Sequence, residues 1–200
     1  MTGIDEPEVD QGQHDGREDV LAVGAAGALV RQDVWDDLDG IDPALGPYGD
    51  GADLSRRARL AGHRVVVVPG AVVRHAQASL SSPVTGPVLR RPGWDAARSE
   101  RERREAFLYG QLVGVPLLLV PIVAVLALVS GLLRALGRLV TKEPHLVAGE
   151  LWAPWAVLVR FPRVVRGRRR AARTRRLPRR SLRPLQVGWR VVVRQARDRR

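Results

Sequence analysis

Residues 14–75 read HDGREDVLAVGAAGALVRQDVWDDLDGIDPALGPYGDGADLSRRARLAGHRVVVVPGAVVRH. The stretch alternates short apolar runs with segments of helical spacing, a pattern typical of a mixed α/β fold. Residues 20–23 and the valine-rich residues 64–68 lie beside glycine or proline, so each is predicted to form a buried strand. Residues 28–31 and 71–75 are predicted to be shorter extended pieces.

Two helices are predicted between these extended segments. Asp33 can cap a short first helix, and Asp53 can cap a second helix that runs to about Ala61. Gly62 follows as a natural C-terminal stop. Two or three strands and two helices bury too little apolar surface to be stable alone. We therefore expect an α/β unit with an incomplete sheet, equivalent to half of a domain.

The charge of the chain is distributed very unevenly. The net charge is +12, yet residues 1–89 carry a net charge of −7 and residues 134–200 carry +17. Cysteine is absent, which excludes disulfide bonds and thiolate metal sites. An acidic part followed by a basic part is typical of a soluble unit joined to a segment that faces an anionic surface.

An uncharged run extends over residues 106–133. Its length is enough to cross a hydrocarbon core of ~30 Å once, but too short for two ordinary spans. Pro116 and Pro121 are expected to kink this segment or to mark a re-entrant element. Residues 146–159 are also apolar, but a glutamate and a proline interrupt them, and their two tryptophans suit an interfacial position.

An ordered series of motifs within residues 14–75 resembles the second half of the catalytic domain of family 2 glycosyltransferases. The resemblance is strongest to large membrane-linked actinobacterial members. Its residues are Arg31, Trp35, Leu38, Gly40 and Asp42, then Asp50, Asp53, Leu54 and Arg57, and finally residues 61–65 (AGHRV), Pro69, Ala71 and His75.

The resemblance implies a GT-A type α/β fold and an inverting transfer of a glycosyl group. The family's acidic loop supplies the general base from the second residue of an acidic pair. That position is Gly51 here, so Asp50, which matches the first residue of the pair, is the candidate base or the neighbour of the lost base position. Asp53 is the second catalytic candidate, and Trp35 and Arg57 are candidate substrate-binding residues. Ordinary roles remain open for these residues, such as a helix cap for Asp53 and a core position for Trp35.

The resemblance also implies cofactors. A divalent metal, Mn²⁺ or Mg²⁺, is expected together with a nucleotide-sugar donor, and His75 matches a histidine that can help to bind the metal. The family's main metal motif, Asp-x-Asp, lies further upstream, and nothing ahead of residue 20 matches it. We therefore expect the donor-binding half to be missing, and the chain alone to be inactive.

The arginines near the C-terminus form the third notable feature. So many cations beside an apolar segment favour the cytoplasmic leaflet and anionic lipid headgroups. Nucleic acid is not expected as a partner, because no zinc finger, helix-turn-helix or RNP pattern is present. The candidate membrane-surface residues are Arg168, Arg169, Arg170, Arg173, Arg175 and Arg176.

Six segments are thus predicted. They are an acidic leader (1–18), a partial glycosyltransferase catalytic domain (19–78), a linker (79–105), a transmembrane or re-entrant helix (106–140), an interfacial tryptophan-containing segment (146–159) and a basic, partly disordered tail (160–200).

The favoured hypothesis is a membrane protein of the glycosyltransferase family that modifies a cell-envelope glycan. Two alternatives remain open: a non-catalytic remnant or subunit that completes a separate nucleotide-binding chain, and a basic membrane-surface binding protein. The catalytic part and the basic tail are both expected on the cytoplasmic side of the cell membrane. One full span cannot satisfy both, so a re-entrant helix, a return of the chain through residues 146–159, or further spans upstream are required.

Overall fold

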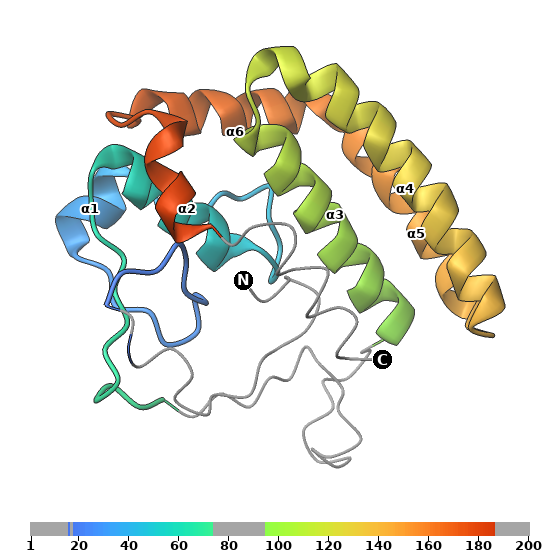
Figure 1. Ribbon diagram of the computed structural model, residues 1–200, viewed down its shortest axis with the longest axis horizontal. Helices are drawn as coiled ribbons and strands as arrows, with labels where there is room; N and C mark the ends of the chain where they lie inside the picture. Colours follow the sequence, from blue (N-terminus) through green and yellow to red (C-terminus); the bar gives the residue numbers. More distant parts are fainter. Residues whose placement is uncertain (1–15, 17, 74–94, 187–200) are drawn as a thin grey trace.

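The computed structural model describes residue 16, residues 18–73 and residues 95–186 of the chain. Helices dominate these residues (Figure 1). Their order is α1 (Gln32–Asp37), α2 (Asp50–Ala61), α3 (Ala96–Gly114), the 3-10 turn η3 (Leu117–Leu119), α4 (Val120–Val140), α5 (Pro144–Val159), α6 (Phe161–Arg173) and the 3-10 segment η4 (Arg179–Leu185).

No sheet forms within the described residues, so the expectation of an α/β unit is corrected to a mostly helical fold. The predicted strands at residues 20–23 and 64–68 are reduced to one antiparallel bridge between Asp19 and Val66. Val66 and Val68 are 38% and 58% exposed, so the valine-rich run is not buried. A β-branched run forms a ladder only where neighbouring strands pair with it, and only residues 18–20 do so here.

Helices α1 and α2 pack against each other through a small apolar cluster that includes Val34, Leu38 and Leu54. Helix α1 begins after the extended residue Arg31, so Asp33 lies in its first turn and does not cap it. Helix α2 starts four residues earlier than predicted, at Asp50, with Gly49 and not Asp53 at its N-cap position. Its C-terminal stop at Gly62 is confirmed, with a left-handed φ of 99° that favours glycine.

The uncharged run 106–133 is divided between two helices. Its first part completes α3, which begins with the side chain of Asp95 capping the backbone N–H of Ala97. Val115 is extended, as is usual before a proline, and Pro116 separates α3 from η3 and α4. Pro121 lies at the start of α4, where a proline needs no backbone partner, and therefore does not kink the helix.

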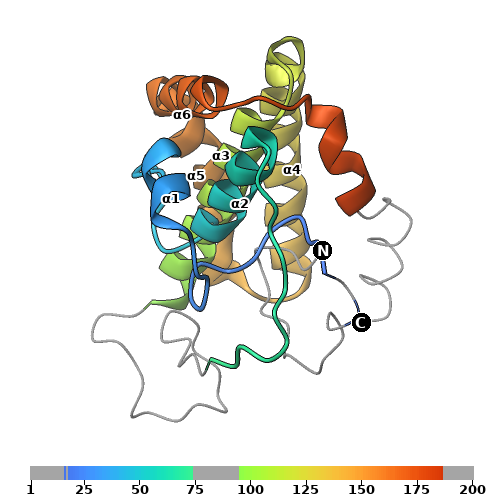
Figure 2. The same ribbon diagram turned by 90° about the vertical axis from the view of Figure 1, so that its left-hand side faces the viewer.

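Helices α4 and α5 form an antiparallel pair, and α5 packs against both α3 and α4 (Figures 1 and 2). Pro154 has no N–H, so the carbonyl of Glu150 lacks its partner within α5. Gly131 of α4 lies against that carbonyl, because an added Cβ would be 2.8 Å from the Glu150 oxygen and 3.0 Å from Pro154 Cγ. The missing side chain lets the two helices approach closely.

Buried Glu150 also joins these helices through charge. Its carboxylate is 2.9 Å from Arg134 Nε and 3.2 Å from Arg138 Nε, both on α4. A second contact of 2.9 Å connects Arg138 to Glu100 on α3. The glutamate that interrupts the apolar pattern of residues 146–159 is therefore neutralised inside the helix bundle.

Residues Leu117–Val140 are long and apolar enough to cross a membrane once. Only 17% of this apolar window is buried within the protein, which argues against an ordinary core helix. Leu126, Leu133 and Leu136 are each more than half exposed on α4, and Trp152 and Trp155 are 54% and 58% exposed on α5. The α4–α5 pair therefore presents an apolar outer face.

The basic segment turns back over the rest of the molecule (Figures 1 and 2). The sequence predicts a partly disordered tail, whereas α6 and η4 bring order as far as residue 186. The backbone N–H groups of Arg176 and Leu177 both donate to the carbonyl of Leu60 at the end of α2. The tail is thereby attached to the motif-bearing N-terminal unit.

Candidate functional site

Asp53 and Arg57 form a buried ion pair on α2. Arg57 Nε lies 2.7 Å from Asp53 Oδ2, and the same guanidinium donates to the carbonyls of Leu38 at 2.7 Å and Gly40 at 2.6 Å. Both side chains are almost fully buried. Within the described residues this pair fixes the loop after α1 against α2. Substrate binding by Arg57 and a catalytic role for Asp53 stay predictions.

Asp50 lies in the first turn of α2, next to Gly51, the predicted position of the general base. Its carboxylate accepts a hydrogen bond of 2.7 Å from the backbone N–H of Gly51. Gly51 itself is packed against the backbone of the preceding segment, since an added Cβ would lie 2.4 Å from the Val23 oxygen and 2.5 Å from the Ala25 nitrogen. Gly51, the predicted position of the general base, is therefore closed to any side chain in this conformation.

Trp35 covers the turn that follows α1. Its indole is 37% exposed, and a Cβ added at Gly40 would lie 3.0 Å from its ring. Gly40 has a left-handed φ of 63°, which favours glycine. The exposed part of the ring leaves its predicted substrate contact open.

The family generally uses a divalent metal and a nucleotide sugar. Among the residues that the structure describes, no group of three or more His, Cys, Asp or Glu side chains could hold a metal ion. Those residues alone therefore do not fit the metal. His75 lies outside the described residues.

Asp42 and Tyr109 form a contact that the sequence patterns did not reveal. Asp42 follows the Gly40 motif and is buried, and its carboxylate accepts hydrogen bonds from the Tyr109 hydroxyl at 2.6 Å and from the Ala44 N–H at 2.9 Å. Burial, reinforced by the hydrogen bond to Asp42, raises the pKa of Tyr109 above its usual range. A tyrosine within the uncharged run was the available hint, but only the fold shows that it reaches a family-motif aspartate.

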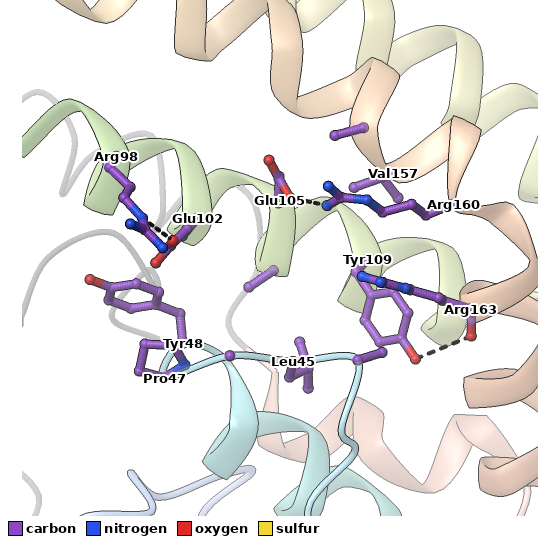
Figure 3. Close-up of a pocket in the computed structure, with 14 residues that line it drawn as sticks. Leu45, Pro47, Tyr48, Arg98, Glu102, Glu105, Tyr109, Val157, Arg160 and Arg163 are labelled. Atoms are coloured by element: carbon purple, nitrogen blue, oxygen red, sulfur yellow. Dashed lines mark hydrogen bonds and ion pairs between the residues drawn. The ribbon is translucent and has the colours of Figure 1, made fainter.

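A pocket of about 380 Å³ lies beside this contact, between the loop of residues 44–48 and helices α3, α5 and α6 (Figure 3). Tyr48 and Tyr109 contribute aromatic surface to it. Its charged lining is arranged in ion pairs, Arg98 with Glu102 at 2.8 Å and Arg160 with Glu105 at 3.1 Å. The pocket thus combines aromatic faces with hydrogen-bonding groups of both charges.

The six arginines predicted to face the membrane differ in burial, and two of them are partly buried. Arg168 is half-buried and donates to the carbonyls of Leu112 and Val115 at 2.5 Å and 2.8 Å. Arg170 pairs with Asp39.

The other four arginines of the set are exposed. Arg173 lies 3.6 Å from Asp39, and Arg176 lies 4.0 Å from Asp37. Arg169 and Arg175 are exposed without such a pair within the described residues. The acidic and basic halves of the chain therefore partly neutralise each other, and lipid contact by the exposed arginines stays a prediction.

The described residues thus combine a motif-bearing unit of two helices, a polar pocket beside it, and one helix long and apolar enough to cross a membrane. Residues 2–104, just over half of the chain, match the family described as "Glycosyltransferase like family 2". The chain belongs to this glycosyltransferase family. No curated protein and no solved structure matches this chain.

Proposed function

We propose that this protein is a membrane-associated glycosyltransferase-family member that takes part in transfer of a glycosyl group from a nucleotide sugar to a cell-envelope glycan. The observation that carries the proposal is the pocket beside Asp42. One wall is the loop of residues 44–48, inside the family match, and the opposite wall comes from α3, α5 and α6. The loop of the family match therefore meets α3 and α5, the helices that pack against the candidate membrane span α4, at one ligand-sized cavity.

The lining of this pocket suits the glycan part of an acceptor. Aromatic rings such as those of Tyr48 and Tyr109 pack against the C–H faces of sugars. Carboxylates and guanidinium groups, here Glu102, Glu105 and Arg160, exchange hydrogen bonds with sugar hydroxyls. The volume of about 380 Å³ is adequate for one or two sugar units.

Transfer requires a base near the acceptor hydroxyl. The hydroxyl oxygen bonds to the anomeric carbon, the base takes its proton, and the nucleoside diphosphate leaves. Asp50 is the candidate for this role, since Gly51 bears no carboxylate and is closed to one.

The return of the chain through α5 supports the proposed location. Helix α5 runs back along α4 and brings α6 to the end of the hairpin where α4 begins (Figure 1). The motif-bearing unit and the basic segment then lie on the same side of the apolar face, as a cytoplasmic nucleotide-sugar enzyme with a positive-inside tail requires.

The test of this function uses the purified chain in lipid nanodiscs. Oligosaccharide binding is followed by saturation-transfer NMR, and transfer by radiolabelled nucleotide sugars. We expect Glu105→Gln to weaken oligosaccharide binding about tenfold, the effect of one charge-assisted hydrogen bond. The exposed control Arg166→Gln is expected to bind normally. Equal binding by both variants would remove the pocket from the acceptor site.

A second candidate function is a non-catalytic subunit, and the closed position at Gly51 favours it. In that case the pocket binds a glycan while another chain performs the transfer. Sugar transfer by the purified chain, lost in Asp50→Asn, would exclude this candidate. Glycan binding without transfer, together with co-purification of a nucleotide-binding polypeptide, would support it.

A further inference from the structure

Three arginines from separate elements converge on the C-terminal end of α3. Arg168 of α6 donates to the carbonyls of Leu112, Val113 and Val115. Arg179 of η4 donates from Nε to the Gly114 carbonyl at 3.0 Å. Arg56 of α2 reaches the same turn, because a Cβ added at Gly114 would lie 2.6 Å from Arg56 Nη1. We refer to Arg56, Arg168 and Arg179 as the α3-end cluster.

The α3-end cluster carries more positive charge than its surroundings neutralise. Arg56 Nη2 is buried and has no hydrogen-bond partner within the described residues. The nearest carboxylate, Asp53, is 3.6 Å away and already holds Arg57 at 2.7 Å. Burial lowers the pKa of Arg56, and repulsion from Arg57 and Arg168 adds to this despite the attraction of Asp53. An incompletely paired, half-buried charge is costly unless an anion compensates it.

The hydrogen bonds to the α3 carbonyls use only some of the N–H donors of the α3-end cluster. A guanidinium group has five N–H donors. Among the described residues, Arg168 uses only Nη1 and Arg179 uses only Nε for hydrogen bonds. The pKa of Arg179 is lowered by burial and then by repulsion from Arg175, Arg168 and Arg56. Donors without a partner among the described residues therefore remain in Arg56, Arg168 and Arg179.

An apolar surface begins immediately beyond this cluster. Leu117 and Leu118, two and three residues after Val115, are 70% and 89% exposed. The outward face of α4 continues the apolar surface with Ile122 and Val125, which are 55% and 59% exposed. Cationic donors and an exposed hydrocarbon-compatible face are thus adjacent along the chain.

We propose that the α3-end cluster binds the anionic phosphate of a lipid headgroup, whose hydrocarbon chains lie along the exposed face of η3 and α4. Arg56 supplies Nη2, which has no hydrogen-bond acceptor among the described residues, and Arg168 and Arg179 supply their remaining donors. A free phosphate would satisfy the charge but would leave Leu117 and Leu118 in water. The combination of both surfaces selects an amphiphile. This binding site goes beyond the proposed sugar transfer and does not depend on it.

The test measures binding of the full purified chain to phosphatidylcholine vesicles doped with phosphatidic acid. Vesicles doped with diacylglycerol, which lacks the phosphate, are the matched lipid control. We expect Arg56→Gln to reduce the affinity for phosphatidic acid about tenfold or more, as one or two charge-assisted hydrogen bonds are lost. Because Arg56 Nη2 has no hydrogen-bond acceptor among the described residues and lies 3.6 Å from Asp53, this variant should retain most of the thermal stability of the parent without lipid. Arg166→Gln, an exposed arginine outside the cluster, should bind within about twofold of the parent.

Two outcomes would overturn the proposal. Equal losses in Arg56→Gln and Arg166→Gln would show diffuse attraction to the surface charge and no defined site. Inorganic phosphate that binds the chain as tightly as phosphatidic acid vesicles would show that the apolar face contributes nothing. Neither readout involves sugar transfer, so failure here is distinguishable from failure of the proposed function.

Discussion

Replacement of Arg57 by methionine is expected to be the most destabilising single change in the N-terminal unit. Methionine preserves much of the volume but removes every donor, so Asp53 loses its 2.7 Å partner and the carbonyls of Leu38 and Gly40 lose theirs. Breaking a buried pair in this way costs about 3–5 kcal/mol, because the remaining charge stays buried. At about 2–4 °C per kcal/mol for a chain of this size, the melting temperature should fall by roughly 6–20 °C.

Thermal unfolding in mild detergent, followed by tryptophan fluorescence, measures this shift. Arg31→Met is the matched control, since Arg31 forms an ion pair of the same type with Asp33 at 2.6 Å but both side chains are exposed. The control should leave the melting temperature unchanged, because solvent screens such pairs. The double variant Asp53→Asn/Arg57→Met should recover part of the loss, because the Asp53 carboxylate is no longer buried without Arg57. A shift below about 2 °C for Arg57→Met, equivalent to less than about 1 kcal/mol, would refute the reasoning.

Three further predictions concern other positions. The pKa of Tyr109 is raised, so its hydroxyl should ionise only well above the usual tyrosine range. Its contribution to the free energy of unfolding is fully present below about pH 10 and is lost as the pH rises. Absorbance at 295 nm should show one phenolate that forms at unusually high pH, and Tyr109→Phe should remove it. Gly131→Leu should separate α4 from α5 and lower the melting temperature, whereas substitution at Gly137, which has open space around it, should not. Gly51→Asp should destabilise the N-terminal unit, because an added side chain clashes with the backbone there; urea unfolding measures this effect. The variant should not gain a general base, and a sugar-transfer assay tests that expectation.

The sequence allowed the helices to be predicted better than the extended segments. Helix α2 and its stop at Gly62 follow from local spacing and backbone preference, and both are present in the structure. The valine-rich residues 64–68 have strong strand preference, but a strand needs partners from elsewhere in the chain. Within the described residues only one bridge, at Val66, is formed. The strand preference of residues 64–68 therefore does not produce a sheet without a second strand to pair with.

The pocket and its supporting contacts were beyond the reach of sequence patterns. The motif series singles out Asp42, but its partner Tyr109 is 67 residues away on a helix that begins with charged residues. The uncharged run 106–133 predicts a membrane helix. Nothing in it indicates that the residues before Pro116 belong to the buried helix α3. Long-range pairing of this kind depends on how the helices pack, and not on the spacing within any one of them.

The attachment of Arg170 to the N-terminal unit has a consequence for the order of folding. Its partners Asp39 and Ile41 lie 131 and 129 residues earlier in the chain. During synthesis, residues 18–73 emerge before any part of α6 has been made. The acidic surface around Asp39 then stays uncovered while the apolar α4 is being produced, and the last contacts to form join the earliest and latest parts of the described chain. The exposed apolar face of α4 is therefore not covered by these contacts during synthesis, the stage at which such a surface is most prone to aggregate.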